Sequence, residues 1–262
     1  MPGLGVRDVA HSFGDRVALD GVSFDVVPGV LTGLLGPNGV RRRFTGSSGM
    51  AGDGWFRAWT VSVTVGEFVG FCVPALVGGF VVGRSAAVAV PLLVAAGSVE
   101  GAVLGWSQAR VLGRVLPGLS TRRWVAGTAI AAAIAWLIGL IPSTFNSALS
   151  TWPVGALIVI GVILGTLLLC SIGTAQWLEL RRHVPRAGWW VLVTAAAWCA
   201  GLLAFVAVTS LLWQPGQPDL LIAAIGVVGG LIMAVTMATT SGWALVRLVG
   251  SVWSQGRTSA GV

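Results

Sequence analysis

Six long apolar segments follow one another through most of the chain, and they constrain the fold more than any other feature. They cover approximately residues 61–83, 86–108, 124–142, 153–178, 189–213 and 220–246. A helix of about 20 apolar residues crosses a bilayer, and it satisfies its own backbone hydrogen bonds there. The segments therefore predict a mainly α fold, with a six-helix transmembrane bundle over residues 59–262. Only 10% of the residues are charged, which excludes an ordinary soluble domain.

The arginines predict the orientation of these helices. All 16 basic residues are Arg, and the formal net charge is +7. If the N-terminus is cytoplasmic, the outside loops hold only Arg84, and thirteen arginines lie on the inside, as positive-inside topology requires. These are Arg41, Arg42, Arg43, Arg57, Arg110, Arg114, Arg122, Arg123, Arg181, Arg182, Arg186, Arg247 and Arg257.

This arrangement indicates the class of partner and the location of the chain. Because the arginines flank apolar segments, we expect the lipid bilayer as partner and no nucleic acid. The Ala-, Gly-, Val- and Arg-rich composition without Lys is typical of a GC-rich genome. We therefore expect a multi-pass protein of the bacterial inner membrane with both termini in the cytoplasm.

The first 43 residues differ from the remainder of the chain. Short runs of alternating polar and apolar residues predict three strands, at 6–13, 17–26 and 30–35, followed by the turn residues of Gly36-Pro-Asn-Gly39. A basic linker rich in Gly and Ser follows over residues 44–58. Since about forty residues bury too little surface for a stable core, this segment is expected to be a fragment.

Two stretches of this fragment carry a family resemblance, Ala18-Leu-Asp-Gly-Val-Ser-Phe-Asp25 and Thr32-Gly-Leu-Leu-Gly-Pro-Asn-Gly39. The fragment resembles the beginning of an ABC transporter ATP-binding subunit, where a strand leads into the phosphate-binding loop. The resemblance implies that Phe13 would stack on adenine. It also implies nucleotide contacts at Gly36, Asn38, Gly39 and Arg42.

The resemblance ends where phosphate chemistry would begin. A P-loop needs Gly-x-x-x-x-Gly-Lys-Ser/Thr. Counted from Gly36, the last three positions are Arg41, Arg42 and Arg43. This degenerate loop predicts a vestigial site without ATPase activity. ATP would be a cofactor, and other ABC subunits partners, only if the fragment is functional.

An internal repeat lies at the centre of the bundle. Gly105, Gln108, Leu112 and Pro117 recur 68 residues later as Gly173, Gln176, Leu180 and Pro185. Each copy comprises a helix, a basic loop and a returning helix, over about 86–142 and 153–213. Because each copy has two spans, both keep the same orientation, as in parallel transporter repeats. The first and sixth helices are candidates for a diverged third copy, although no register between them is evident.

Three polar residues within the spans are the candidate functional residues. Gln108 and Gln176 would either form interhelical hydrogen bonds or line a vestibule between the repeats. Glu100 is the acid well inside a span, where a carboxylate is costly and usually functional. It would either pair with Arg110 or couple to a proton or cation. We expect Glu67 near the membrane interface.

No catalytic or metal-ligating arrangement is evident in the sequence. Cys72, Cys170 and Cys199 lie apart in apolar runs, and His183 lies alone in a basic loop. We therefore expect a non-enzymatic membrane protein with no metal and no resident cofactor, with a structural, regulatory or transport-related role. The alternatives are a component of an ABC transport system and a proton- or ion-coupled carrier using Glu100. A homo-oligomer is compatible with each of them.

Overall fold

The computed structural model describes residues 4–13, 16–26, 48–116 and 118–258. The chain divides into two compact units, Met1–Ala51 and Gly52–Val262, which are described separately. The first unit contains the described strands and the second contains the helical bundle. The predicted mainly α fold with a short β-rich segment before it is confirmed.

Strands β1 (Leu4–Phe13) and β2 (Arg16–Val26) form an antiparallel hairpin. Register shifts between Val6 and Ser12 interrupt the pairing, and near them the Asp8 amide donates to the Ser23 hydroxyl over 2.8 Å. The first two predicted strands are thus confirmed. The third, together with Gly36, Asn38, Gly39 and Arg42, lies outside the described residues.

Six long helices form the second unit, and two short ones follow the third of them. The long helices are α1 (Ser48–Val81), α2 (Ala86–Leu112), α3 (Thr121–Gly139), α6 (Val154–Leu180), α7 (Trp189–Leu212) and α8 (Asp219–Thr258). The short helices are α4 (Ile141–Thr144) and α5 (Asn146–Leu149).

The length and surface of the helices fit a bilayer. The candidate spans have 24 to 29 residues and mean hydropathies of 1.7 to 2.6, and no more than 33% of each apolar window is buried by protein. Apolar side chains therefore cover the outside of the bundle, as a chain surrounded by lipid requires. Each predicted span corresponds to one of these helices. Helix α1 begins at Ser48, so residues 48–58, which the sequence placed in a linker, are helical.

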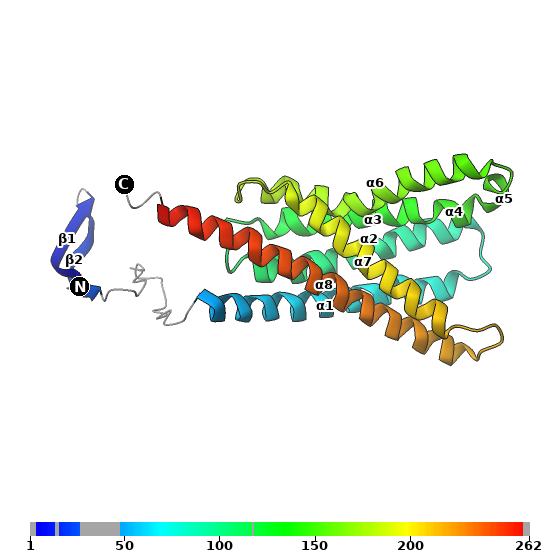
Figure 1. Ribbon diagram of the computed structural model, residues 1–262, viewed down its shortest axis with the longest axis horizontal. Coiled ribbons are helices and arrows are strands. Elements are labelled where there is room, and N and C mark those ends of the chain that lie inside the picture. Colours follow the sequence, from blue (N-terminus) through cyan, green and yellow to red (C-terminus); the bar gives the residue numbers. More distant parts are fainter. Residues whose placement is uncertain (1–3, 14–15, 27–47, 117, 259–262) are drawn as a thin grey trace. The chain divides into compact units, whose positions relative to one another are not determined.

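The six helices form a closed ring. Neighbours pack in the order α2, α3, α6, α7 and α8. Helix α1 closes the ring, because Gly66 lies against Ser107 of α2 and Phe71 lies against Gly230 of α8. Figure 1 shows α1 and α8 running along each other although they are the first and last helices described.

Glycines set the closest helix contacts. A Cβ added to Gly105 would lie 3.0 Å from Cβ of Thr128 on α3, and one added to Gly173 would lie 2.9 Å from Cα of Val191 on α7. The two repeats therefore pack their paired helices through equivalent glycines. By contrast, a Cβ added to Gly161 or Gly165, in the first half of α6, would have no neighbour within 4 Å among the described residues.

Candidate functional site

Three tryptophans meet inside one end of the bundle. Trp59, Trp124 and Trp190 lie near the starts of α1, α3 and α7, and none is more than 1% exposed. The ring of Trp190 lies 6.0 Å from that of Trp59, edge to face, and 6.4 Å from that of Trp124. We call this end, where α1, α3 and α7 begin and α2, α6 and α8 end, the arginine-rich end. Its described arginines are Arg57, Arg110, Arg114, Arg122, Arg123, Arg181, Arg182, Arg186, Arg247 and Arg257.

The two repeated glutamines lie beside these tryptophans and bond to each other. Nε2 of Gln176 donates to Oε1 of Gln108 over 2.7 Å and to the Thr128 hydroxyl over 3.1 Å. Each glutamine also accepts from the indole of its own repeat, Gln108 from Trp124 at 3.2 Å and Gln176 from Trp190 at 2.8 Å. Both glutamine side chains are buried. The structure therefore brings Gln108 and Gln176 together as an interhelical hydrogen-bonded pair.

A third helix pair repeats the same pattern. Trp59 of α1 donates its indole N–H to the Ser241 hydroxyl of α8 over 3.1 Å. Ser241 is followed four residues later by Leu245, as Gln108 is by Leu112 and Gln176 by Leu180, and all three leucines are 1% exposed. Helices α8 and α1 thus form the third copy, with its first helix at the end of the sequence. We call the seven residues of these contacts the glutamine–tryptophan layer, namely Trp59, Gln108, Trp124, Thr128, Gln176, Trp190 and Ser241.

A pair of carboxyl groups lies deeper in the bundle. Glu67 is near the middle of the span Gly54–Val81, and Glu100 is near the middle of Ala86–Leu112. They are 0% and 5% exposed, and their carboxyl groups interact with each other. The backbones are close at this level, since a Cβ on Gly70 would lie 3.2 Å from Cα of Glu100. We call Glu67 and Glu100 the carboxyl pair.

The two members of the carboxyl pair have different surroundings. Oε2 of Glu100 accepts from the Trp136 indole over 2.7 Å. Neither carboxyl oxygen of Glu67 has a hydrogen-bond partner of standard geometry among the residues that the structure describes. A buried carboxyl without a bonded partner is costly, and in membrane proteins such groups usually mark a proton or ion path.

Two sequence-based expectations about these acids are wrong. Glu67 is buried at mid-span, because α1 begins well before residue 61, where the apolar segment was judged to start. Arg110 does not pair with Glu100, since its guanidinium stacks on the Trp106 ring at 4.5 Å. The spacing Glu67-x₂-Gly70 could have indicated that this face of α1 packs against another helix, because it places a small residue one turn from the acid.

Glu179 joins the two basic loops at the arginine-rich end. Its carboxylate accepts from Nε and Nη2 of Arg123, at 2.7 and 3.1 Å, and from the Ser120 amide at 2.9 Å. His183 lies 3.4 Å from the same carboxylate, so it is not alone in its loop. Glu179 belongs to the second repeat, whereas Ser120 and Arg123 belong to the first. Sequence reasoning missed this contact because it links residues almost sixty positions apart.

Other ligand sets are absent from the described part of the chain. Within it, no group of three or more His, Cys, Asp and Glu side chains is arranged to hold a metal ion. Cys72, Cys170 and Cys199 are free. The buried polar side chains of the described bundle are thus the carboxyl pair, the glutamine–tryptophan layer, Glu179, and the hydroxyls of Ser107 and Thr194.

Comparisons of the chain with protein-family models, with curated proteins and with solved structures find no match. Its six apolar helices are consistent with a multi-pass membrane protein. The function must therefore be inferred from the buried groups themselves.

Proposed function

We propose that this chain is a non-enzymatic carrier of protons or small monovalent cations in a bacterial cell membrane, with the carboxyl pair as its ion-binding site. The observation that supports the proposal is Glu67, a fully buried mid-span carboxyl group that interacts with a second buried carboxyl group, that of Glu100. Two such groups at mid-span are costly to an apolar bundle, which makes a structural role a poor explanation.

The chemistry of the pair suits one small cation at a time. Two neighbouring carboxylates repel each other in an apolar setting, and one proton or one cation between them removes most of that repulsion. Trp136 holds one oxygen of Glu100 in place. Glu67 has no such bond, so its carboxyl group is the one free to bind and release the ion.

The proposed location follows from the charges at the two ends. The arginine-rich end holds ten described arginines, and the loops at the opposite end hold Arg84. Positive-inside topology places the arginine-rich end in the cytoplasm. The carboxyl pair would then lie about halfway between the two aqueous phases.

The test is ion flux into liposomes that contain the purified full-length chain. We expect imposed H⁺, Na⁺ or K⁺ gradients to drive flux in the wild type, and E67Q and E100Q to reduce it at least tenfold by removing one of two anionic ligands. E179Q is the matched control, because it changes a third buried glutamate outside the pair and should leave flux within twofold.

Folding of each variant is checked by its thermal unfolding in detergent. Folded E67Q and E100Q proteins with undiminished flux would contradict the proposal, as would a folded wild type that carries none of the three ions.

The second candidate function is a component of an ABC transport system. The observation behind it is the sequence of residues 18–25 and 32–39, which resembles the beginning of an ABC transporter ATP-binding subunit. In this case Phe13, Gly36, Asn38, Gly39 and Arg42 would contact ATP. Peptide mapping of the native protein should then find residues 1–49 in one polypeptide with the helices, and photolabelling by an ATP analogue should be lost when those residues are removed.

A further inference from the structure

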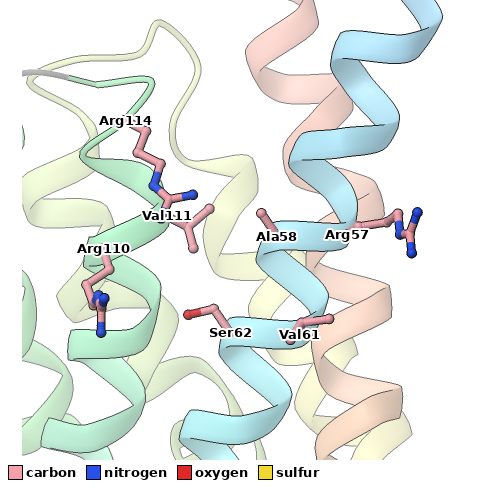
Figure 2. A pocket seen from close by; sticks show the side chains of 7 residues that line it. All are labelled: Arg57, Ala58, Val61, Ser62, Arg110, Val111 and Arg114. Carbon is pink, nitrogen blue, oxygen red and sulfur yellow. The ribbon is translucent and has the colours of Figure 1, made fainter.

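A basic cleft lies between α1 and α2 at the arginine-rich end. It has a volume of about 450 Å³, and its lining includes Arg110 and Val111 of α2, Arg114 two residues after the end of α2, and Ala58 and Ser62 of α1. In Figure 2 Ala58 and Ser62 face α2, while Val111 and Arg114 extend toward α1. The two helices meet at the inner end of the cleft, where the Ser62 hydroxyl donates to the Ser107 carbonyl over 3.0 Å and Gly66 lies against Ser107.

Arg110 and Arg114 of this cleft form no ion pair with the described side chains. In the described residues, the salt bridges at this end all go to Glu179, from Arg123, Arg182 and His183. Arg110 and Arg114 have no carboxylate within 4.0 Å among the side chains that the structure describes, and Arg57 also lines the cleft. The cleft therefore presents positive charge that nothing described in the bundle neutralises.

The cleft changes from charged to apolar along the helices. Arg110 stacks on Trp106, which is 51% exposed, and such an indole is typical of the membrane interface. Val61 lines the cleft and is 63% exposed, and Val65 lies one turn deeper and is 56% exposed. A ligand here would contact guanidinium groups at one end and an apolar, lipid-facing helix surface at the other.

We propose that this cleft binds the phosphate headgroup of an anionic phospholipid, with Arg110 and Arg114 on the phosphate and the acyl chains along Val61 and Val65. Arginine binds phosphate through charge-assisted, bidentate hydrogen bonds, and basic pockets between membrane helices suit anionic headgroups. A free phosphate ion would use the arginines but leave the valines uncovered. The proposal does not depend on ion transport by the carboxyl pair.

The test is native mass spectrometry of the full chain in detergent with added phosphatidylglycerol, phosphatidylcholine or inorganic phosphate. The double variant R110Q/R114Q should weaken phosphatidylglycerol binding about thirtyfold. R181Q/R247Q is the matched control: it removes the same charge at the same end, and its arginines also stack on tryptophans, 5.0 Å from Trp177 and 3.5 Å from Trp243. It should change binding by less than threefold.

Further outcomes keep the proposal testable if the glutamine variant folds poorly. R110K/R114K keeps both charges and should retain most of the binding, because an ammonium group also binds phosphate. Equal losses in the two glutamine double variants would overturn the proposal by showing a diffuse charge effect. Phosphatidylcholine binding as tightly as phosphatidylglycerol would also overturn it, as would displacement of the lipid by equimolar inorganic phosphate.

Discussion

The helix pairs α2–α3 and α6–α7 are two versions of one unit, and they agree in one layer while differing in another. In both, a tryptophan of the returning helix donates to a glutamine of the first helix, Trp124 to Gln108 and Trp190 to Gln176. In both units a glycine of the first helix, Gly105 or Gly173, lets the returning helix approach closely. The shared contacts are the ones that hold two helices together, which is the role of a scaffold.

The difference lies at mid-span. The first unit has Glu100 bonded to Trp136, and the register of the second unit places Leu168 and Leu202 at the same positions. The α8–α1 pair has Met233 and Phe71 there. Both polar partners are thus replaced together by apolar residues in two of three units. The bundle does not need them for packing, which supports a specialised role for the carboxyl pair.

The largest expected effect concerns the glycines that both units share. G105V and G173V should each lower the free energy of unfolding by about 3 kcal/mol, because the added side chain must push two helix backbones apart. G161V is the control and should change it by less than about 0.5 kcal/mol, since that glycine faces no neighbour. Thermal and SDS-induced unfolding in detergent measure the effect. Equal tolerance of valine at all three positions would refute equivalent packing in the two units.

The next effect separates the two glutamines. Q176L removes two donated bonds and one accepted bond and should cost about 2 kcal/mol, at about 0.6 kcal/mol for each interhelical bond. Q108L removes two accepted bonds and should cost about 1 kcal/mol. T166V serves as control, because that hydroxyl bonds within its own helix. The same unfolding assay measures both variants. A larger loss of unfolding free energy in Q108L than in Q176L would contradict the larger number of interhelical bonds made by Gln176.

A smaller effect tests the contact between the units. R123Q should lower the thermal unfolding temperature slightly, because it breaks a bidentate pair whose carboxylate is buried although Arg123 is half exposed. R122Q removes a neighbouring arginine for which the structure shows no salt bridge and should be neutral. Proteolysis of the loops 113–120 and 181–188 gives a second readout, since both should be cut faster in R123Q alone. Equal behaviour of the two variants would remove Glu179 as the link between the units.

The smallest effect compares one threonine from each unit. Thr128 accepts from Gln176, whereas the equivalent Thr194 hydroxyl is buried without a partner in the described residues. T128V should therefore cost about 0.6 kcal/mol, and T194V should be neutral or slightly stabilising, because it removes an unsatisfied polar group. A precise unfolding titration is needed for effects of this size. Destabilisation by T194V alone would mean that Thr194 has a partner.

The sequence was sufficient for features that depend on local pattern. The span of α6 ends within two residues of its predicted limit, because apolar residues dominate the segment and Arg181 and Arg182 follow it directly. Gln108 and Gln176 were identified because the two copies follow each other in the same order. The sequence also predicted that Glu100 and Gln108 share one face of α2, because they are two helical turns apart.

Features that depend on which helices become neighbours could not be predicted. Glu67 meets Glu100 only because α1 packs against α2, and no periodicity within α1 indicates this. The first and sixth helices were candidates for a third copy, but no register for it was evident in the sequence, because its halves, marked by Ser241 and Trp59, are separated by nearly the whole bundle. The link from Glu179 to Arg123 likewise depends on how two loops fold over each other. Helix content is a local property of this chain, whereas its polar contacts are a property of the assembled ring.

The pairing of α8 with α1 has a consequence for the order in which the protein is made. During synthesis α1 enters the membrane first, and the hydroxyl that accepts from Trp59 arrives only after four further spans. The ring therefore stays open until α8 is inserted. The same arrangement makes the chain suitable for circular permutation within the bundle. If α8 were joined to α1 by a short basic loop and the chain opened between Val81 and Ala86, the three units would follow one another in sequence as they do around the ring.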